Sequence, residues 1–389
     1  MRLVPWSYNI KSLLVRKSTT ALTVISIGAT VAVLAGVLSL ERGFKTLFTS
    51  GGRNDIMIFL RIGATSEGES GLRRDQVRVI QNNLPEIATD ESGRPLASPE
   101  SYLAVRLRKL DGGETNVPIR GVGPRTFDIH GDTFEIVSGR NIRPGSDEVL
   151  VGEKLPGRIR NCTIGEEILI NTSPFQVVGT FRCPGPYTSE IWGDVERMAD
   201  ALQRIAYQRV IARLRPEVDS KVFADAMAEH PQAPTFVVSE REYLESQTAA
   251  ISFTLRYLGI FLATIMGIAA VFTSTNTMLS ALSSRTHEIG ILLSVGFRPI
   301  PIFISFLFEA MILGLLGGLV GSLLVLPLSG IETGTTNFQT FTEVAFAFRV
   351  TPDVLQTAIL FALVLGLLGG ALPAWKASRM RPIEALRRT

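Results

Sequence analysis

Residue patterns that commonly carry enzyme chemistry are missing from this 389-residue sequence. It has no G-x-x-x-x-G-K-[ST] loop and no Gly-Lys pair, so it lacks the usual means of cradling nucleotide phosphates. His287-Glu288 begins like a zinc-protease helix, but Ile291 stands where the second His would be. With three His, no C-x-x-C pair and no G-x-S-x-G elbow, we predict no catalytic residue, no metal site and no cofactor on this chain.

Two cysteines and one carboxylate are the remaining residues that could have a chemical role. Cys162 and Cys183 lie between strand-like runs whose pairing could bring them into a disulfide, although two separate buried thiols fit the sequence equally well. Glu309 interrupts an apolar stretch, where a carboxylate is costly unless it is paired or protonated. It could act as a switch at a helix interface. We favour a structural hydrogen bond to a neighbour such as Asn276, because an acid without basic partners makes a poor relay.

Four apolar stretches explain why Glu309 is unusual. They cover residues 21–40, 257–282, 300–328 and 354–374, each long enough for a helix to cross a bilayer core of about 30 Å. The first could be a cleaved signal peptide, but it is longer than the usual apolar core of about 7 to 15 residues. We therefore predict four transmembrane helices.

Charge predicts how these helices are oriented. Basic residues cluster before residue 21, between the second and third stretches, and after residue 374. The positive-inside rule then places both termini and the short middle loop in the cytoplasm, and residues 45–250 outside. The near-neutral net charge of +3, without a basic stripe, argues against nucleic-acid binding.

The segments beside the first transmembrane helix have patterns of their own. Residues 1–18 combine apolar residues at helical spacing with basic ones, which predicts an amphipathic helix lying in the lipid interface; the alternative is a disordered basic tail. Residues 45–250 read as a mixed α/β domain of two lobes. We expect strands at 56–62, 102–107, 148–152, 168–171, 175–180, 208–214 and 235–238, helices at 72–84, 194–206 and 220–229, and a helix from 239 that continues into the second transmembrane helix.

Small residues recur at four-residue spacing in the first, third and fourth apolar stretches. Such ridges let helix backbones approach closely, either within one subunit or at a weaker alternative, a dimer seam. The residues are Gly28, Ala32 and Gly36, then Gly314, Gly317, Gly318 and Gly321, and finally Gly366 and Gly370.

Three stretches resemble the FtsX-like permease family: residues 9–27, 285–309 and 373–386. Within the external segment, Gly139-Arg140, EVLVGE at 148–153, Gly165 and FQVVGT at 175–180 are similar to the MacB-type periplasmic core domain. The resemblance implies five parts: an interfacial helix at 1–18, a first transmembrane helix at 19–44, a periplasmic core domain at 45–250, an FtsX-like domain with three helices at 251–376, and a basic cytoplasmic tail at 377–389.

The family implies a multi-pass permease subunit of an ABC transporter in the bacterial inner membrane. ATP and Mg²⁺ are then expected on a separate ATP-binding subunit, so this chain is not itself an enzyme. Further expected partners are a second permease copy or a paralogue, a periplasmic adaptor and membrane lipid. The family's coupling helix, which docks on the ATPase, corresponds here to the loop with Arg285, His287, Glu288, Ile289, Gly290, Leu292 and Gly296. Relatives usually carry Arg where this chain has Leu293.

The residues themselves favour a docking role for that loop, because its charged start is followed by an apolar run. A solvated linker would leave that run exposed to water. The alternative is a plain turn that begins the third transmembrane helix. Two functions remain. One is export or extraction of an envelope substrate, such as a lipid, lipoprotein, peptide or drug; the other is an FtsX-like regulator of a cell-wall hydrolase. The size of the external segment favours the first.

Overall fold

A computed structural model describes residues 13, 15–296, 298–337 and 342–381. The interfacial helix expected at 1–18 therefore lies almost wholly outside the described residues, as does most of the basic tail. The chain divides into two compact units. One comprises Met1–Gly43, Phe253–Ile331 and Ala347–Thr389, and is called here the helical unit; the other comprises Phe44–Ser252 and Glu332–Phe346, and is called the α/β unit.

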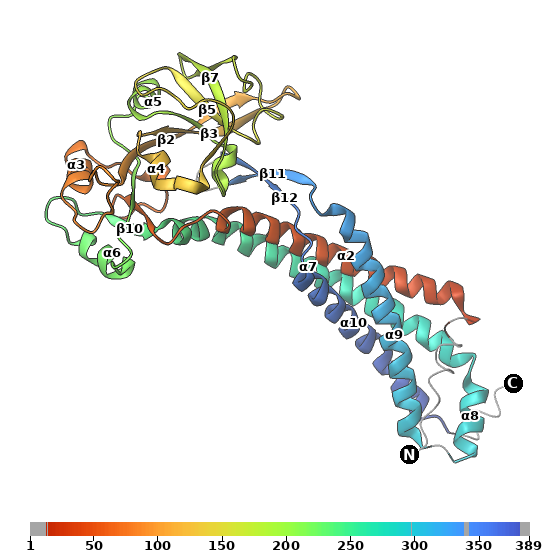
Figure 1. The fold of residues 1–389 in the computed structure, drawn as a ribbon. Coiled ribbons are helices and arrows are strands. Elements are labelled where there is room, and N and C mark those ends of the chain that lie inside the picture. The colour runs from red at the N-terminus through yellow and green to blue at the C-terminus, as the bar shows by residue number, and fades with distance from the viewer. Residues whose placement is uncertain (1–12, 14, 297, 338–341, 382–389) are drawn as a thin grey trace. The chain divides into compact units, whose positions relative to one another are not determined.

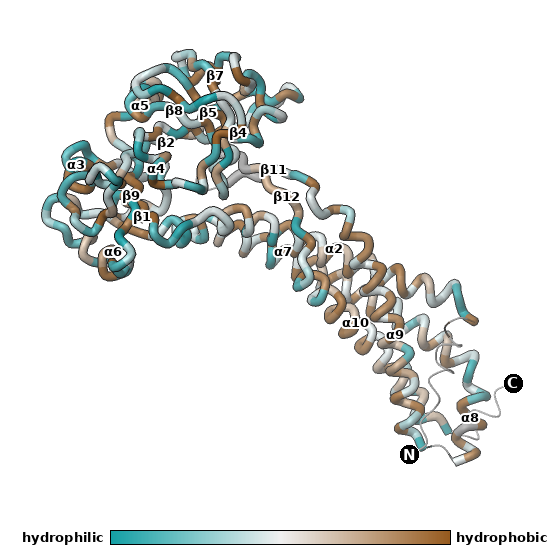
Figure 2. The backbone as a smooth tube through the Cα atoms, viewed as in Figure 1, coloured by the Kyte–Doolittle hydropathy of each residue, from teal (hydrophilic) through white to brown (hydrophobic). Residues whose placement is uncertain are grey.

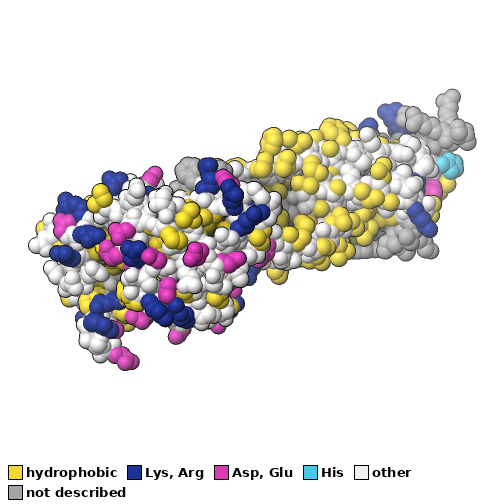
Figure 3. Space-filling view, turned by 90° about the horizontal axis from the view of Figure 1, so that it is seen from above, with side chains coloured by type: hydrophobic (Ala, Val, Ile, Leu, Met, Phe, Trp, Pro, Cys, Tyr) yellow, Lys and Arg dark blue, Asp and Glu magenta, His cyan; other side chains and the backbone are white. Residues whose placement is uncertain are grey.

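Long apolar helices make up the helical unit (Figure 1). Four helices in the described part of the chain are long and apolar enough to cross a membrane: α2 (Lys17–Thr49), α7 (Glu240–Ser283), α9 (Pro299–Val325, extended by a 3₁₀ turn to Leu328) and α10 (Pro352–Ser378). Figure 2 shows hydrophobic residues along these helices, and in Figure 3 apolar side chains cover this unit's visible surface. Pro299 and Pro352 each stand at the first helical position, where a missing N–H costs nothing.

Small residues set the spacing of these helices. The backbones of α9 and α10 meet at Gly314 and Gly366; a Cβ built on Gly366 would lie 2.6 Å from the carbonyl oxygen of Ala310. A Cβ built on Gly321 would lie 2.6 Å from the carbonyl oxygen of Gly28 in α2. These close approaches lie within one subunit, and they leave no room for larger side chains. Gly36 differs, because nothing lies within 4 Å of its built Cβ.

One sheet runs through the whole α/β unit. Its strands are β1 (Ile56–Leu60), β2 (Ala97–Arg108), β3 (Glu114–Val122), β4 (Glu135–Gly139), β5 (Glu148–Gly152), β6 (Glu167–Ile170), β7 (Ser173–Arg182), β8 (Ile191–Asp194), β9 (Arg209–Arg213) and β10 (Phe236–Ser239). They are ordered β10-β1-β9-β2-β3-β8-β5-β7-β4, with β6 beside β7. The long strand β2 pairs with β9 at one end and with β3 along the rest, so it joins the two ends of the sheet.

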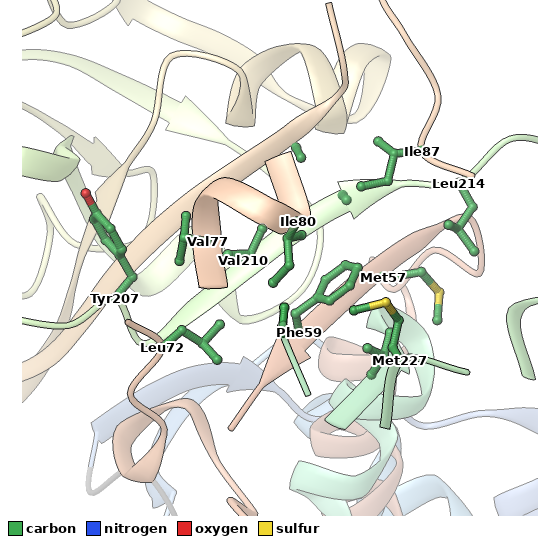
Figure 4. Close-up of a cluster of buried hydrophobic side chains, with 14 of the residues drawn as sticks. Met57, Phe59, Leu72, Val77, Ile80, Ile87, Tyr207, Val210, Leu214 and Met227 are labelled. Carbon is green, nitrogen blue, oxygen red and sulfur yellow. The ribbon is translucent and has the colours of Figure 1, made fainter. Parts of the chain in front are cut away.

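Separate cores define two lobes on this sheet. The first lobe packs α3 (Arg74–Asn82) and α6 (Ser220–Ala228) against β1, β9 and β10; Figure 4 shows Phe59, Ile80, Val210 and Met227 in its core. The second lobe surrounds β3, β5, β7 and β8, with α5 (Val195–Ala201) against them. The short helix α4 (Thr126–His130) follows β3. Charged side chains are scattered over this unit's visible surface (Figure 3).

Local signals explain where several elements begin. Asp194 and Asp219 cap α5 and α6: each carboxylate accepts hydrogen bonds from two backbone N–H groups of the first turn. The turn between β2 and β3 needs a positive φ, which Gly112 supplies at 93°. This turn closes a hairpin of β2 and β3, in which β2 extends beyond the strand expected at 102–107.

A further hairpin joins the α/β unit from the distant loop between α9 and α10. Strands β11 (Glu332–Asn337) and β12 (Thr342–Ala347) pair there. Phe346 is buried and contacts Phe44 edge-on, with ring centroids 5.3 Å apart. The sequence analysis assigned this loop no structure.

The cysteines are two separate buried thiols. Cys162 packs in the core around β6 and β7, whereas Cys183 packs with Tyr187 and Trp192 in a different cluster. The disulfide alternative is therefore wrong for this structure. The strands that flank the cysteines do pair, but β6 and β7 pair antiparallel over Glu167–Ile170 and Ser173–Gln176, which leaves both cysteines beyond the paired residues.

Candidate functional site

The loop after α7 forms a short helix, α8 (Thr286–Ser294), which ends before Gly296. Gly296 adopts a φ of 98°, a conformation that terminates helices and favours glycine. Arg285 occupies the position that precedes the helix. Of the residues assigned to the coupling helix by resemblance, His287, Glu288, Ile289, Gly290 and Leu292 lie on α8, and Arg285 and Gly296 flank it.

One face of α8 packs against the chain itself. Ile289 is only 3% exposed and belongs to an apolar cluster that the ends of α7, α9 and α10 complete. Leu293 packs against the same cluster, which explains why an apolar residue suits this position. The other cluster members are Met278, Leu282, Ile302, Phe306, Ala310, Ala374 and Ala377. Ile289 is therefore not a docking residue, which corrects the sequence analysis.

The opposite face of α8 is open. His287 and Glu288 are exposed, Ile291 is 47% exposed and Val295, just beyond the helix, is 74% exposed. Their spacing of three to four residues puts them on one side of a helix. Gly290 is buried, and the side chain of Leu292 lies outside the described residues. The exposed side chains on this side are therefore His287, Glu288, Ile291 and Val295, called here the open face of α8.

A buried ion pair fixes α8 to the third transmembrane helix. Arg285 donates from Nη1 to Oε2 of Glu309 at 3.0 Å, with side-chain exposures of 9% and 6%. The expectation that Glu309 has no basic partner is wrong, because Arg285 supplies one from the adjacent loop. Asn276, the neighbour suggested from sequence, is exposed on α7. Removing either charge would take this ionic partner away from a buried side chain.

A second buried charge cluster lies in the α/β unit, and the sequence analysis missed it. It comprises Glu67, Glu100, Arg120, Glu190 and Arg209, called here the buried charge network. Burial would raise the pKa of Glu67, but Arg120 and Arg209 hold that pKa below its usual range. The available signal was a charged residue inside an apolar strand, Arg120 in the run VPIRGV.

The buried charged side chains of these two clusters lie in ion pairs. No group of three or more His, Cys, Asp or Glu side chains in the described residues is placed to hold a metal ion. The buried carboxylates are instead occupied by guanidinium partners. The arrangement of both clusters suits holding elements together rather than transforming a substrate.

Comparisons with known proteins agree with this architecture. The model of the MacB-like periplasmic core domain matches residues 20–230, and that of the FtsX-like permease C-terminal domain matches residues 260–382. The macrolide export ATP-binding/permease protein MacB of Pasteurella multocida is 26% identical over 95% of this chain and 58% of its own length. The pyoverdine export ATP-binding/permease protein PvdT of Pseudomonas fluorescens is 28% identical over 94% of this chain and 56% of its own. The chain thus spans less than two thirds of these relatives.

Solved structures also resemble it. The periplasmic region of MacB from Actinobacillus actinomycetemcomitans has a TM-score of 0.36 at 13% identity, covering 49% of this chain and 91% of that one. The extracellular domain of the ABC-type transporter YknZ has a TM-score of 0.34 at 12% identity, covering 47% of this chain and 98% of that one. The two family models alone cover most of the sequence, from the first transmembrane helix to the end of α10. The resemblance predicted from sequence is therefore confirmed, and the chain belongs to the FtsX-like and MacB-like permease family of ABC transporters.

Proposed function

We propose that this chain is the permease subunit of an ABC transporter that exports or extracts an envelope substrate, driven by ATP hydrolysis on a separate ATP-binding subunit. Four helices long and apolar enough to cross a membrane and the match to the FtsX-like permease C-terminal domain support a transport component. The named relatives export a macrolide or pyoverdine, which favours export over the regulatory alternative. A second permease copy and a periplasmic adaptor complete the proposed assembly in the inner membrane, with both termini cytoplasmic.

The observation that carries this proposal is the division of α8 into two faces. Its inner face is held by the apolar cluster around Ile289 and by the ion pair between Arg285 and Glu309. Its open face presents Ile291 and Val295 with a His and a Glu beside them. An apolar centre with polar neighbours is the pattern of a helix that docks into a groove. A displacement of α8 by a bound partner would be transmitted to α9 through the ion pair between Arg285 and Glu309.

The test is to replace Ile291 with Glu in the full chain and to measure co-purification of the ATP-binding subunit. Placing a charge at the centre of a docking surface should abolish co-purification, because it would be desolvated without a partner. The yield and melting of the permease itself should stay unchanged, since Ile291 packs on the outside.

Two matched variants serve as controls for the Ile291→Glu measurement. Ile205→Glu changes an equally apolar and 93% exposed side chain in the α/β unit, and should leave co-purification intact. Ile289→Glu should instead lower the melting temperature, because the charge enters the apolar cluster. Full ATPase binding by the Ile291→Glu variant would refute the docking role of α8.

A further inference from the structure

The first turn of α7 is tied into the interior of the α/β unit. Glu240, its first residue, is 1% exposed. Its carboxylate accepts a hydrogen bond from the Tyr187 hydroxyl at 2.7 Å and another from the backbone N–H of Arg53 at 3.1 Å. One turn further, the Tyr243 hydroxyl accepts from the backbone N–H of Glu67 at 3.0 Å.

Arg53 brings in the other membrane helix, because it follows closely on the end of α2 at Thr49. The backbone N–H of Arg241 donates to the carbonyl of Arg53 at 3.2 Å. Gly52 permits this approach, since a Cβ there would lie 2.5 Å from the Cα of Arg241. The chain leaving α2 and the chain entering α7 therefore meet at Glu240.

From Glu240 the contacts continue into both lobes. Arg209 on β9 donates to the Tyr187 hydroxyl at 3.5 Å and to Glu100 on β2 at 2.7 Å. Arg120 on β3 donates one hydrogen bond to Glu100, at 3.1 Å, and two to Glu190, at 2.7 and 2.8 Å. Strand β9 belongs to the first lobe and β3 to the second, so the buried charge network spans both.

Tyr187 links Glu240 to this network through its hydroxyl. The ring is 1% exposed and contacts Trp192 and His130 edge-on. Burial and the adjacent Glu240 raise the pKa of Tyr187 well above its ordinary value, so the hydroxyl keeps its proton and remains a donor to the carboxylate. A hydrogen bond between buried groups, one of them ionised, is strong and directional.

We infer that Glu240 and Tyr187 are positioning residues through which a displacement of α2 and α7 is delivered to both lobes of the α/β unit. This inference rests on the proposed function: α8 follows directly on α7, so a displacement that the ATP-binding subunit imposes on α8 would reach α7 and, through the contact of Gly259 with Val37, α2. Directional hydrogen bonds fix one arrangement of α7 against the sheet, and a second arrangement would need a different set of hydrogen bonds. Apolar packing at this point would not be directional and would fix the arrangement less well. The two lobes would then respond together because both pack on the same network.

The experiment uses the full chain with its co-purified ATP-binding subunit in lipid nanodiscs. Hydrogen exchange of backbone amides is followed by mass spectrometry with and without a non-hydrolysable ATP analogue. In the parent complex, nucleotide should alter exchange in α8 and also in β2, β8 and β9. In Tyr187→Phe, which removes a single oxygen and keeps the ring packing, the response in α8 should persist while that of the three strands is lost.

Two further variants keep the result interpretable. Tyr207→Phe also removes a partly buried hydroxyl, one that bonds Glu196 on α5 and is not part of the buried charge network, and should leave every nucleotide response intact. Glu240→Gln retains the acceptor oxygen with a weaker bond and should give an intermediate strand response, even if Tyr187→Phe proves unstable.

Outcomes separate the inference from the function beneath it. Undiminished strand responses in both Tyr187→Phe and Glu240→Gln would overturn the inference alone, and so would a parent complex that responds in α8 but not in the strands. A parent complex without any response in α8 would remove the proposed function, and the inference with it.

Discussion

Arg120 forms ion pairs with three carboxylates in the buried interior of the α/β unit. Its guanidinium is 1% exposed and bonds Glu67, Glu100 and Glu190. Without Arg120, Glu190 would lose its guanidinium partner, and Glu67 and Glu100 would be left to share Arg209. Removing one partner from a buried ionic cluster typically costs about 3–5 kcal/mol. We therefore expect Arg120→Met to lower the free energy of unfolding of the α/β unit by about that amount. Urea unfolding of the full chain, read by Trp192 fluorescence with Trp6 and Trp375 replaced by Phe, measures the change.

Arg182→Met is the control for that measurement. Arg182 also meets two carboxylates, Glu135 and Glu153, but its side chain is half exposed. Water and salt screen such pairs, so its loss should change the urea midpoint very little. Equal effects of the two substitutions would contradict the assignment of Arg120 as a buried anchor.

At this scale the sequence predicted residue types better than their partners. It marked Glu309 as needing a partner, and it marked the loop that contains Arg285, yet it did not join them, because the pair forms across a helical turn and a loop. It also treated Ile289 and its neighbours as one apolar run. Only the packing of α8 divides that run into a buried and an open face.

Among the elements, the packing of α9 on α10 depends on glycines. A Cβ on Gly366 would lie 2.6 Å from the carbonyl oxygen of Ala310 and 3.0 Å from the Cα of Gly314. Backbone atoms cannot rotate aside, so Gly366→Ala should separate the helices and cost about 1–3 kcal/mol, typical of overpacking. Heating the detergent-solubilised chain and following the remaining folded fraction by size-exclusion chromatography tests this.

Gly36→Ala is the matched substitution in α2. Nothing lies within 4 Å of its built Cβ, and alanine favours a helix more than glycine does. The folded fraction should therefore survive heating as well as, or slightly better than, the parent. Equal losses from Gly36→Ala and Gly366→Ala would show that close backbone approach is not what Gly366 provides.

Elements with strong local patterns were predictable. Strand β5 covers Glu148–Gly152, the range expected from its apolar run, and α6 differs from expectation by one residue at its end. Strand β8, Ile191–Asp194, was missed because half of its four residues are Gly193 and Asp194, which are depleted in strands. Strands β11 and β12 were missed because Glu332–Asn337 is polar and glycine-containing, without alternation.

For the whole molecule, the proposed orientation makes a labelling prediction. Thr172→Cys, exposed on the α/β unit, should react with a membrane-impermeant maleimide added outside intact inner membranes, whereas Ser284→Cys should react only after lysis. The native thiols give little background, because burial raises the pKa of Cys162 to about 12 and Cys183 is also buried. Reaction of Ser284→Cys, but not Thr172→Cys, in intact membranes would reverse the orientation.

The contact between Phe346 and Phe44 makes the α/β unit discontinuous along the chain. A fragment cut at Phe44 and Ser252 would omit β12, with Ala345 and Phe346, and would uncover the ring of Phe44 that Phe346 now covers. An excised soluble fragment would therefore expose an apolar patch around Phe44 that is covered in the full chain, and we expect it to self-associate. Appending residues 332–346 through a short linker would restore the missing cover and yield a better-behaved reagent for crystallography or binding assays.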